Sequence, residues 1–149
     1  MSIVLQFSYE ELPPTSNHIY IRGTMLTQKA RDYAESFAMA TRRYLHITSS
    51  SAINIHAIYG LHLRFFFYEL VNRTYNDPKT PPSKRAKTRY KKIDLSNRIK
   101  LLEDCVRDLL MVDDSQTFAA SQEKHQCGPG EKEHVEIVVQ RLDTSHFGL

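Results

Sequence analysis

An unbroken two-residue alternation in the middle of the chain constrains the fold more than any other feature of the sequence. From residue 55 every odd position is apolar, whereas the even positions include His56, His62 and Arg64; the apolar set is Ile55, Ala57, Tyr59, Leu61, Leu63, Phe65 and Phe67. Successive side chains of a strand point to opposite faces. The pattern therefore predicts a long strand with one face on the core.

Two helices and a first strand are predicted from shorter patterns. Apolar residues alternate over residues 3–9, as Ile3, Leu5, Phe7 and Tyr9, which is typical of a half-buried strand. Thr27 can cap a helix that is expected to end before residues 49–51. Asp94 or Ser96 can cap a second helix, whose apolar stripe has spacings of three, four and three and comprises Ile99, Leu102, Val106 and Leu109.

The C-terminal part of the chain is expected to form a hairpin. A weak strand pattern at residues 115–123 and a clear one at Val135, Ile137 and Val139 flank the turn sequence of residues 127–130. Residues 142–149 are expected to fray. The order strand, helix, strand, helix, strand, strand predicts one α/β (α+β) domain over residues 1–149, with two helices packed on one mixed sheet.

Length and composition agree with one ordinary globular domain. The chain has 149 residues, of which 41% are hydrophobic and 25% charged. No apolar run approaches the roughly 18 residues of a membrane span, and the N-terminus lacks the pattern of a secretion signal. A cytoplasmic protein without a membrane partner is therefore expected.

The positive charge of the chain is concentrated in one segment. Residues 79–92 carry seven cations and no acid: Lys79, Lys84, Arg85, Lys87, Arg89, Lys91 and Lys92. Three prolines oppose helix and strand here, so residues 72–92 are expected to form a mobile basic loop. Such a positive field favours a polyanion, most commonly nucleic acid. A solvated linker or a nuclear import signal would also carry such a string.

Two acidic motifs flank the second predicted helix. Asp94 and Lys100 stand at its beginning, and Asp113 and Asp114 follow its end. Mg²⁺ takes oxygen ligands, usually one or two protein carboxylates with water and substrate phosphate. The acids and the basic segment together suggest metal-dependent phosphodiester chemistry. Each acid also has an ordinary explanation, because Asp caps helices and favours turns.

These motifs, with residues 13–17 (Pro-Pro-Thr-Ser-Asn), resemble those of the RusA family of Holliday-junction resolvases. The resemblance runs from about residue 12 to about residue 141. It implies a homodimeric endonuclease of bacterial or phage type that binds four-way DNA junctions and cuts opposite strands with Mg²⁺ or Mn²⁺. Asp94, Asp113 and Asp114 then match the family's metal-binding acids. Lys100 matches the motif lysine, which would neutralise phosphate charge, and Asn97 matches the motif asparagine, expected at the DNA.

The sequence departs from the family pattern at Ser96, which stands where the family has a second aspartate. One carboxylate fewer should weaken Mg²⁺ binding, although the hydroxyl could still cap the helix or orient a metal-bound water. A non-catalytic protein that binds junctions or other nucleic acid is therefore the alternative function.

The predicted helix length suggests how the acids are arranged. A helix from about Asn97 to Leu110 would be about 20 Å long and would hold Asp94 and Asp114 at opposite ends. One metal ion cannot span that distance, because its oxygen ligands lie about 2 Å away. Either the helix ends early, or a second protomer supplies Asp113 or Asp114.

Overall fold

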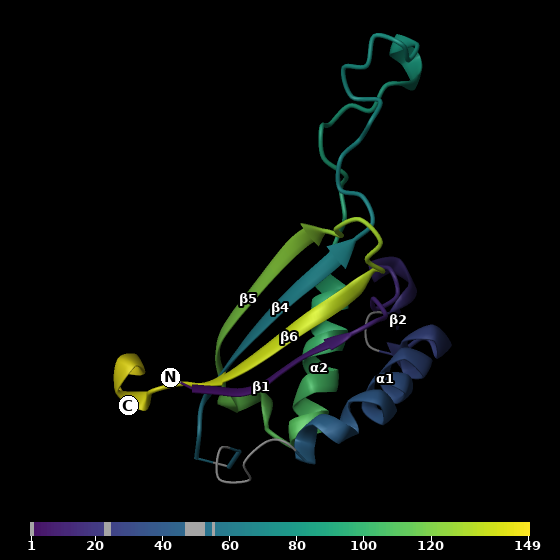
Figure 1. Cartoon of the computed structure of the whole chain (residues 1–149). Helices are drawn as coiled ribbons and strands as arrows, with labels where there is room; N and C mark the ends of the chain where they lie inside the picture. Colours follow the sequence, from purple (N-terminus) through teal and green to yellow (C-terminus); the bar gives the residue numbers. More distant parts are fainter. Residues whose placement is uncertain (1, 23–24, 47–52, 55) are drawn as a thin grey trace.

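The computed structural model describes residues 2–22, 25–46, 53–54 and 56–149 (Figure 1). Its helices and strands follow in the order β1 (Ser2–Tyr9), β2 (Tyr20–Ile21), β3 (Met25–Leu26), α1 (Gln28–Thr41), β4 (Tyr59–Phe67), α2 (Ser96–Leu110), β5 (Thr117–Gln126) and β6 (His134–Arg141). Both α-helices lie on one face of a mixed four-stranded sheet. The predicted α+β class and element order are confirmed, with the small β2–β3 hairpin as an addition.

The sheet has the strand order β1-β6-β4-β5, so the predicted C-terminal hairpin is wrong. β5 pairs with β4 in parallel, whereas β6 lies between β4 and β1 and is antiparallel to both. The connection over residues 127–133 is long enough to pass the end of β4, where the Cys127 amide donates to the Phe67 carbonyl (2.8 Å). β6 takes an inner position because its apolar side chains Val135, Ile137 and Val139 are all buried.

The alternation that predicts the central strand is confirmed over most of its length. β4 begins at Tyr59, and its odd-numbered side chains are buried under the helices. Ile55 lies outside the described residues. In β1 a bulge between Ile3 and Leu5 shifts the register, so that Val4 is buried and Ile3, expected in the core, is 57% exposed.

Both helices begin near their predicted caps. The Thr27 hydroxyl accepts from the Ala30 amide (3.2 Å) and so caps α1. This helix is expected to end before residues 49–51, which themselves lie outside the described residues, and α1 ends at Thr41 in agreement with that expectation. Ser96 is the first residue of α2, and Asp94 accepts from its amide (2.9 Å). α2 buries a wider face than predicted, comprising Arg98, Leu101, Leu102, Cys105, Val106, Leu109 and Leu110.

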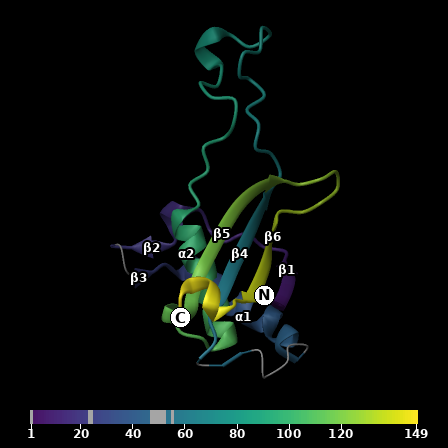
Figure 2. The same cartoon turned by 90° about the vertical axis from the view of Figure 1, so that its left-hand side faces the viewer.

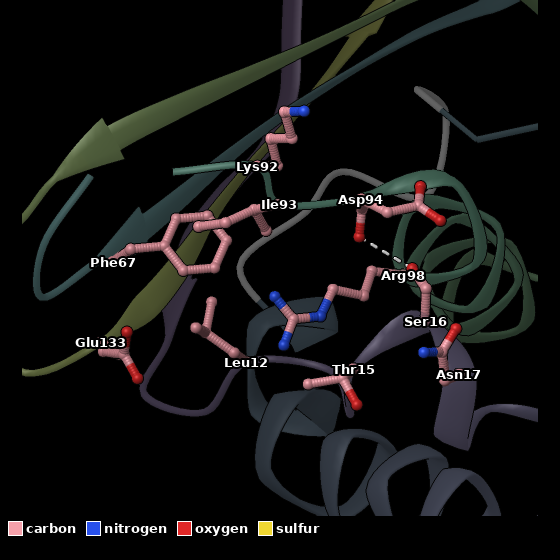
Figure 3. A pocket seen from close by; sticks show the side chains of 10 residues that line it. All are labelled: Leu12, Thr15, Ser16, Asn17, Phe67, Lys92, Ile93, Asp94, Arg98 and Glu133. Atoms are coloured by element: carbon pink, nitrogen blue, oxygen red, sulfur yellow. Dashed lines mark hydrogen bonds between the residues drawn. The ribbon is translucent and has the colours of Figure 1, made fainter. Parts of the chain in front are cut away.

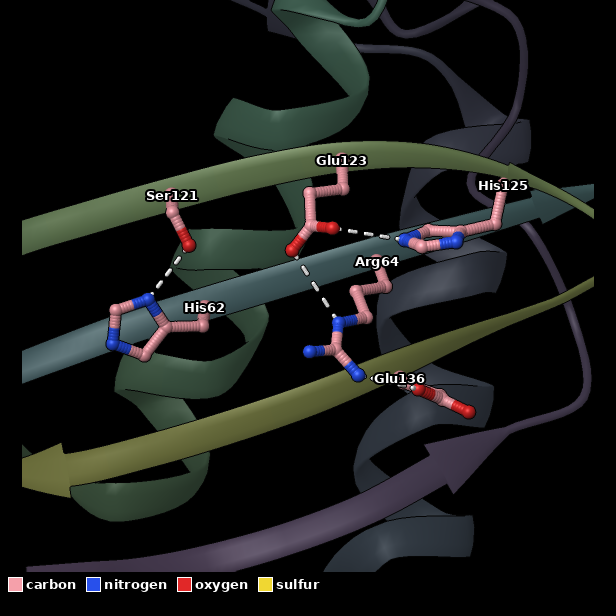
Figure 4. Close-up of polar contacts among 6 residues, drawn as sticks. All are labelled: His62, Arg64, Ser121, Glu123, His125 and Glu136. Atoms are coloured by element: carbon pink, nitrogen blue, oxygen red, sulfur yellow. Dashed lines mark hydrogen bonds and ion pairs between the residues drawn. The ribbon is translucent and has the colours of Figure 1, made fainter.

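The sheet face opposite the helices carries paired polar side chains (Figure 4). Arg64 lies between Glu123 (3.4 Å) and Glu136 (3.6 Å). The two ring nitrogens of His62 lie within hydrogen-bond distance of Ser121 (2.6 Å) and Gln140 (3.0 Å). His62 is therefore a satisfied surface group.

Residues 70–92, here called the arm, project beyond the sheet from the end of β4 (Figures 1 and 2). The two limbs are joined near the base by a bridge between Val71 and Tyr90, where Lys91 also donates to Leu70 (2.8 Å). The segment expected as a mobile loop therefore has internal hydrogen bonds. Residues 142–149, expected to fray, contact the rest of the fold at two points: Leu142 is buried, and the Phe147 ring packs on Phe118.

Candidate active site

The beginning of α2 is fastened to the segment after β1 by three hydrogen bonds. The Ser16 hydroxyl donates to the Asp94 carbonyl (2.8 Å), and the Asn97 amide donates to the Ser16 carbonyl (3.0 Å). Arg98 Nε donates to the Pro14 carbonyl (3.0 Å). Ser16 is only 7% exposed, so its bond is protected from water. Two motifs that lie far apart in the sequence thus form one unit, here called the clasp.

The clasp holds the Asp94 carboxylate on the surface at the base of the arm. Asp94 Oδ1 accepts from the amide (2.9 Å) and the hydroxyl (2.8 Å) of Ser96, and these bonds hold the pKa of Asp94 below its ordinary value. Oδ2 has no hydrogen-bond partner among the described residues. A fully ionised carboxylate with a free oxygen can bind a divalent cation.

A pocket of about 390 Å³ lies beside Asp94 (Figure 3). It is walled by apolar side chains such as Phe67 and Ile93, by Glu133 and by Lys92 from the base of the arm. The Arg98 side chain reaches into this pocket from α2, and its guanidinium carbon lies 5.5 Å from the centre of the Phe67 ring. Burial lowers the pKa of Arg98, because a buried charge loses hydration.

Lys100 and Asn97, both predicted at the site, have partners other than the Asp94 carboxylate. Lys100 Nζ lies 4.8 Å above the Tyr20 ring, on the β2–β3 hairpin. Asp104, four residues further along α2, is paired with Arg107. Asn97 contributes its amide to the clasp. Neither residue contacts the Asp94 carboxylate among the described hydrogen bonds and ion pairs.

Asp113 and Asp114 lie at the opposite end of α2. Hydrogen bonds from the Ser115 side chain and from its amide (2.8 Å) lower the pKa of Asp113, which also closes a capping box with Gln116. Asp114 is 87% exposed, and its Oδ1 lies 3.8 Å from Arg107 Nη1. At this end, the Asp113 carboxylate serves as a cap, whereas the Asp114 carboxylate faces solvent beside Arg107.

One chain does not bring the predicted metal ligands together. α2 runs without interruption from Ser96 to Leu110, which is about 22 Å at 1.5 Å per residue. Asp94 precedes its beginning, and Asp113 and Asp114 follow its end. Within the described ranges no three His, Cys, Asp or Glu side chains form a metal-binding group. The donors at Asp94 suit a Mg²⁺ ion that keeps most of its water ligands.

The arm presents most of its cations to solvent. Lys79, Lys84, Lys87 and Lys92 are exposed and make no ion pair in the described part of the chain. Lys91 lies 3.9 Å from Glu69, Arg85 donates to the Thr80 carbonyl (2.8 Å), and Arg89 lies over the Tyr90 ring. Tyr90 itself is 61% exposed. Unpaired cations and an exposed ring suit contacts to phosphates and bases.

Two residues of the site carry no role in the sequence-based prediction. Arg98 lies within the apolar stripe of α2, and this interruption is the one sequence signal for it. Ser16 belongs to the segment of residues 13–17, but its partner Asp94 is 78 positions away in the chain. Sequence spacing cannot predict such a pairing.

One comparison with known proteins identifies the family of this chain. A family model described as Endodeoxyribonuclease RusA matches residues 11–140, a range that includes the clasp, the arm and both ends of α2. Comparison with curated proteins gave no match. None of the described helices is both long and apolar enough to cross a membrane. Since the match covers most of the chain, the protein belongs to the RusA family of endodeoxyribonucleases, which resolve Holliday junctions.

Proposed function

We propose that this protein is a metal-dependent, structure-selective endonuclease that binds four-way DNA junctions as a homodimer and cuts opposite strands. The observation that carries the proposal is the clasp, which fixes an exposed, ionised Asp94 at the base of a cationic arm. The family match supports cleavage of DNA. The proposed place of action is the cytoplasm of a bacterial cell.

Asp94 is the proposed primary ligand of Mg²⁺ or Mn²⁺, with the Ser96 hydroxyl beside it. When bound, such an ion lowers the pKa of a coordinated water and stabilises the leaving oxygen. The Ser96 hydrogen bonds keep Asp94 ionised and orient its carboxylate. Lys100 is the proposed electrostatic partner of the reacting phosphate, which requires its amine to leave the Tyr20 ring when DNA binds.

A homodimer supplies the remaining ligands in this proposal. The length of α2 keeps Asp94 and Asp114 of one chain apart. A two-fold axis that places two α2 helices antiparallel would bring the beginning of one helix to the end of the other. Asp114, and with it Asp113, would then complete the site of the opposite protomer. Two such composite sites would cut two strands.

The arm binds the phosphate backbone in this proposal. Contacts of its cations with phosphates do not depend on base sequence, and they would be made next to the proposed metal site. If the arm makes six phosphate contacts, affinity falls roughly a thousandfold between 50 and 200 mM salt. Strong salt dependence is thus an expected property of junction binding.

Ser96 favours a second candidate function, a junction-binding protein without catalysis. Its hydroxyl donates to Asp94 Oδ1 (2.8 Å), where the family has a second acid. A site with fewer charges holds a divalent cation more weakly. The clasp and the arm would still serve DNA binding in that case.

A labelled four-way junction separates the two functions. The parent protein with Mg²⁺ or Mn²⁺ is expected to cut it, whereas Asp94→Asn is expected to bind with similar affinity and to cut roughly a hundredfold more slowly or worse. Asp108→Asn, which removes an exposed acid of the same helix, serves as the matched control. Binding by the parent without cutting in either metal would establish the second function.

A further inference from the structure

Arg98 is the one charged residue in the buried part of the described chain, with 8% of its surface exposed. It lies on the face of α2 that packs against the sheet, among apolar neighbours such as Leu101 and Leu102. Burial of a charge is unfavourable unless a partner compensates it. A cation at this position therefore needs an explanation beyond packing.

The side chain is held at two points and is open at its end. Nε donates to the Pro14 carbonyl (3.0 Å), and the guanidinium lies against the Phe67 ring. The two Nη groups have no hydrogen-bond or ion-pair partner in the part of the chain that the structure describes. A guanidinium has five N–H donors in a fixed fork. Four of the five thus remain available, in an orientation that the protein has already set.

The acids of the pocket leave these donors free. Glu133 Oε2 accepts from the Tyr68 amide (3.0 Å), and Glu133 forms no ion pair with Arg98, although its charge favours the charged arginine. Asp94 is hydrogen-bonded to Ser96, and Figure 3 shows its carboxylate turned away from the guanidinium. The other cation of the pocket, Lys92, stands at the base of the arm. The fork suits an anion with several oxygens.

We propose that Arg98 and its pocket form a phosphate-binding site that holds a DNA phosphodiester next to the one being cut. This inference rests on the proposed function, because it places the reacting phosphate at Asp94. Arg98 points away from the Asp94 carboxylate, so it binds a neighbouring phosphate of the same strand. A bidentate contact there fixes the register of the strand relative to the metal site.

The first test compares variants of Arg98. Arg98→Met keeps the apolar stem among Phe67 and its neighbours but removes the fork, and Arg98→Lys keeps the charge alone. Cleavage is expected to fall roughly ten- to a hundredfold in Arg98→Met and less in Arg98→Lys. Arg64→Met, which removes an exposed arginine from the opposite sheet face, is the matched control. Thermal unfolding of each variant reports whether it is folded.

The second test neutralises single phosphates of the junction with methylphosphonates near the cut. At one flanking position the methylphosphonate is expected to slow the parent about as much as the substitution Arg98→Met slows cleavage of the unmodified junction. Arg98→Met should not be slowed further by a methylphosphonate at that position. Additive losses at every position, or parent-like cleavage by Arg98→Met, would overturn the site.

The same substrates keep this inference separate from the proposed function. If the parent does not cut any junction, the nuclease proposal fails. The phosphate site is then tested by the affinity of both proteins for the same methylphosphonate junctions. The affinity of the parent should fall at one methylphosphonate position to which folded Arg98→Met is insensitive. Equal sensitivity of both proteins at all positions would reject the site. If Arg98→Met does not fold, Arg98→Lys takes its place in both measurements.

Discussion

The two ends of α2 both carry acids that are predicted metal ligands, but their surroundings in the structure differ. At the beginning, Asp94 is fixed by the clasp and keeps one carboxylate oxygen free beside an open pocket. At the end, Asp113 caps a turn, and Asp114 is exposed beside Arg107. The first end thus presents a carboxylate oxygen without a protein partner, whereas the second end forms a capped turn of the chain.

This difference shows that an acidic motif does not define a metal site by itself. What distinguishes the first end is its surroundings: a segment from after β1, the base of the arm and a buried arginine all meet there. The second end gains a catalytic role only if a partner protomer brings it to such surroundings. The following predictions test this distinction, in order of decreasing effect.

The largest effect is expected at Asp114, the exposed carboxylate of the second end. Asp114→Asn should slow junction cleavage roughly a hundredfold, because it removes a proposed metal ligand without changing a packed side chain. Asp113→Asn should slow it less, since Asn caps as well as Asp and this carboxylate is already engaged with Ser115. Single-turnover cleavage rates compare the two variants. Equal loss in both would remove the distinction between cap and ligand.

Removal of two arm cations should change the salt dependence of junction binding by about tenfold. Lys84→Gln with Lys87→Gln removes two exposed charges from the arm. The slope of log affinity against log salt concentration should therefore fall in magnitude by about 2, so that the loss of affinity between 50 and 200 mM salt becomes about tenfold smaller. Lys29→Gln with Lys124→Gln removes two exposed charges elsewhere and should leave the slope unchanged. Fluorescence anisotropy at several salt concentrations measures both. An unchanged slope in the arm variant would mean that DNA does not contact these lysines.

A severalfold effect on metal dependence is expected at the position that departs from the family. Ser96→Asp adds a carboxylate beside Asp94, so cleavage should reach half its maximal rate at a lower Mg²⁺ concentration. Ser96→Asn has a similar size without the charge and should not show this change. Cleavage rates over a Mg²⁺ titration decide between them. The same Mg²⁺ requirement in both variants would argue against metal binding at this end of α2.

The smallest effect concerns the clasp. Ser16→Ala removes the donor to the Asp94 carbonyl, and the free energy of unfolding should fall by about 1 kcal/mol, as for the loss of one protected hydrogen bond. Ser8→Ala, at an exposed position of β1, is the control. Urea unfolding measures both variants. A stability equal to the parent would show that the clasp adds little to the fold.

Much of the fold can be predicted from the sequence because side-chain periodicity reports burial. The alternation of β4 and the stripe of α2 both coincide with buried faces. Strand order is not predicted in the same way. β6 enters the sheet between β1 and β4 through contacts that are distant in sequence, and the bulge that exposes Ile3 has no signal in the alternation.

The candidate site divides along a similar line. Asp94 and the arm cations are suggested by local motifs and charge, and both lie at the same end of α2. Ser16 and Arg98 take their roles from three-dimensional contacts, with Asp94 and with Pro14, respectively. A single arginine on the apolar face of a helix is a weak sequence signal, and it does not identify the contact with Pro14. The separation of Asp94 from Asp114 follows from helix length alone and is predicted correctly.

Cleavage by a mixed dimer tests the proposed composite site most directly. Asp94→Asn and Asp114→Asn proteins with different tags would be combined, and the heterodimer purified and given a four-way junction with Mg²⁺. If the two ends of α2 meet across the dimer, one site of the heterodimer is intact. The heterodimer then nicks one strand much faster than either variant alone, each of which is slowed roughly a hundredfold. A heterodimer that cuts as slowly as the two variant homodimers would contradict a site shared between protomers.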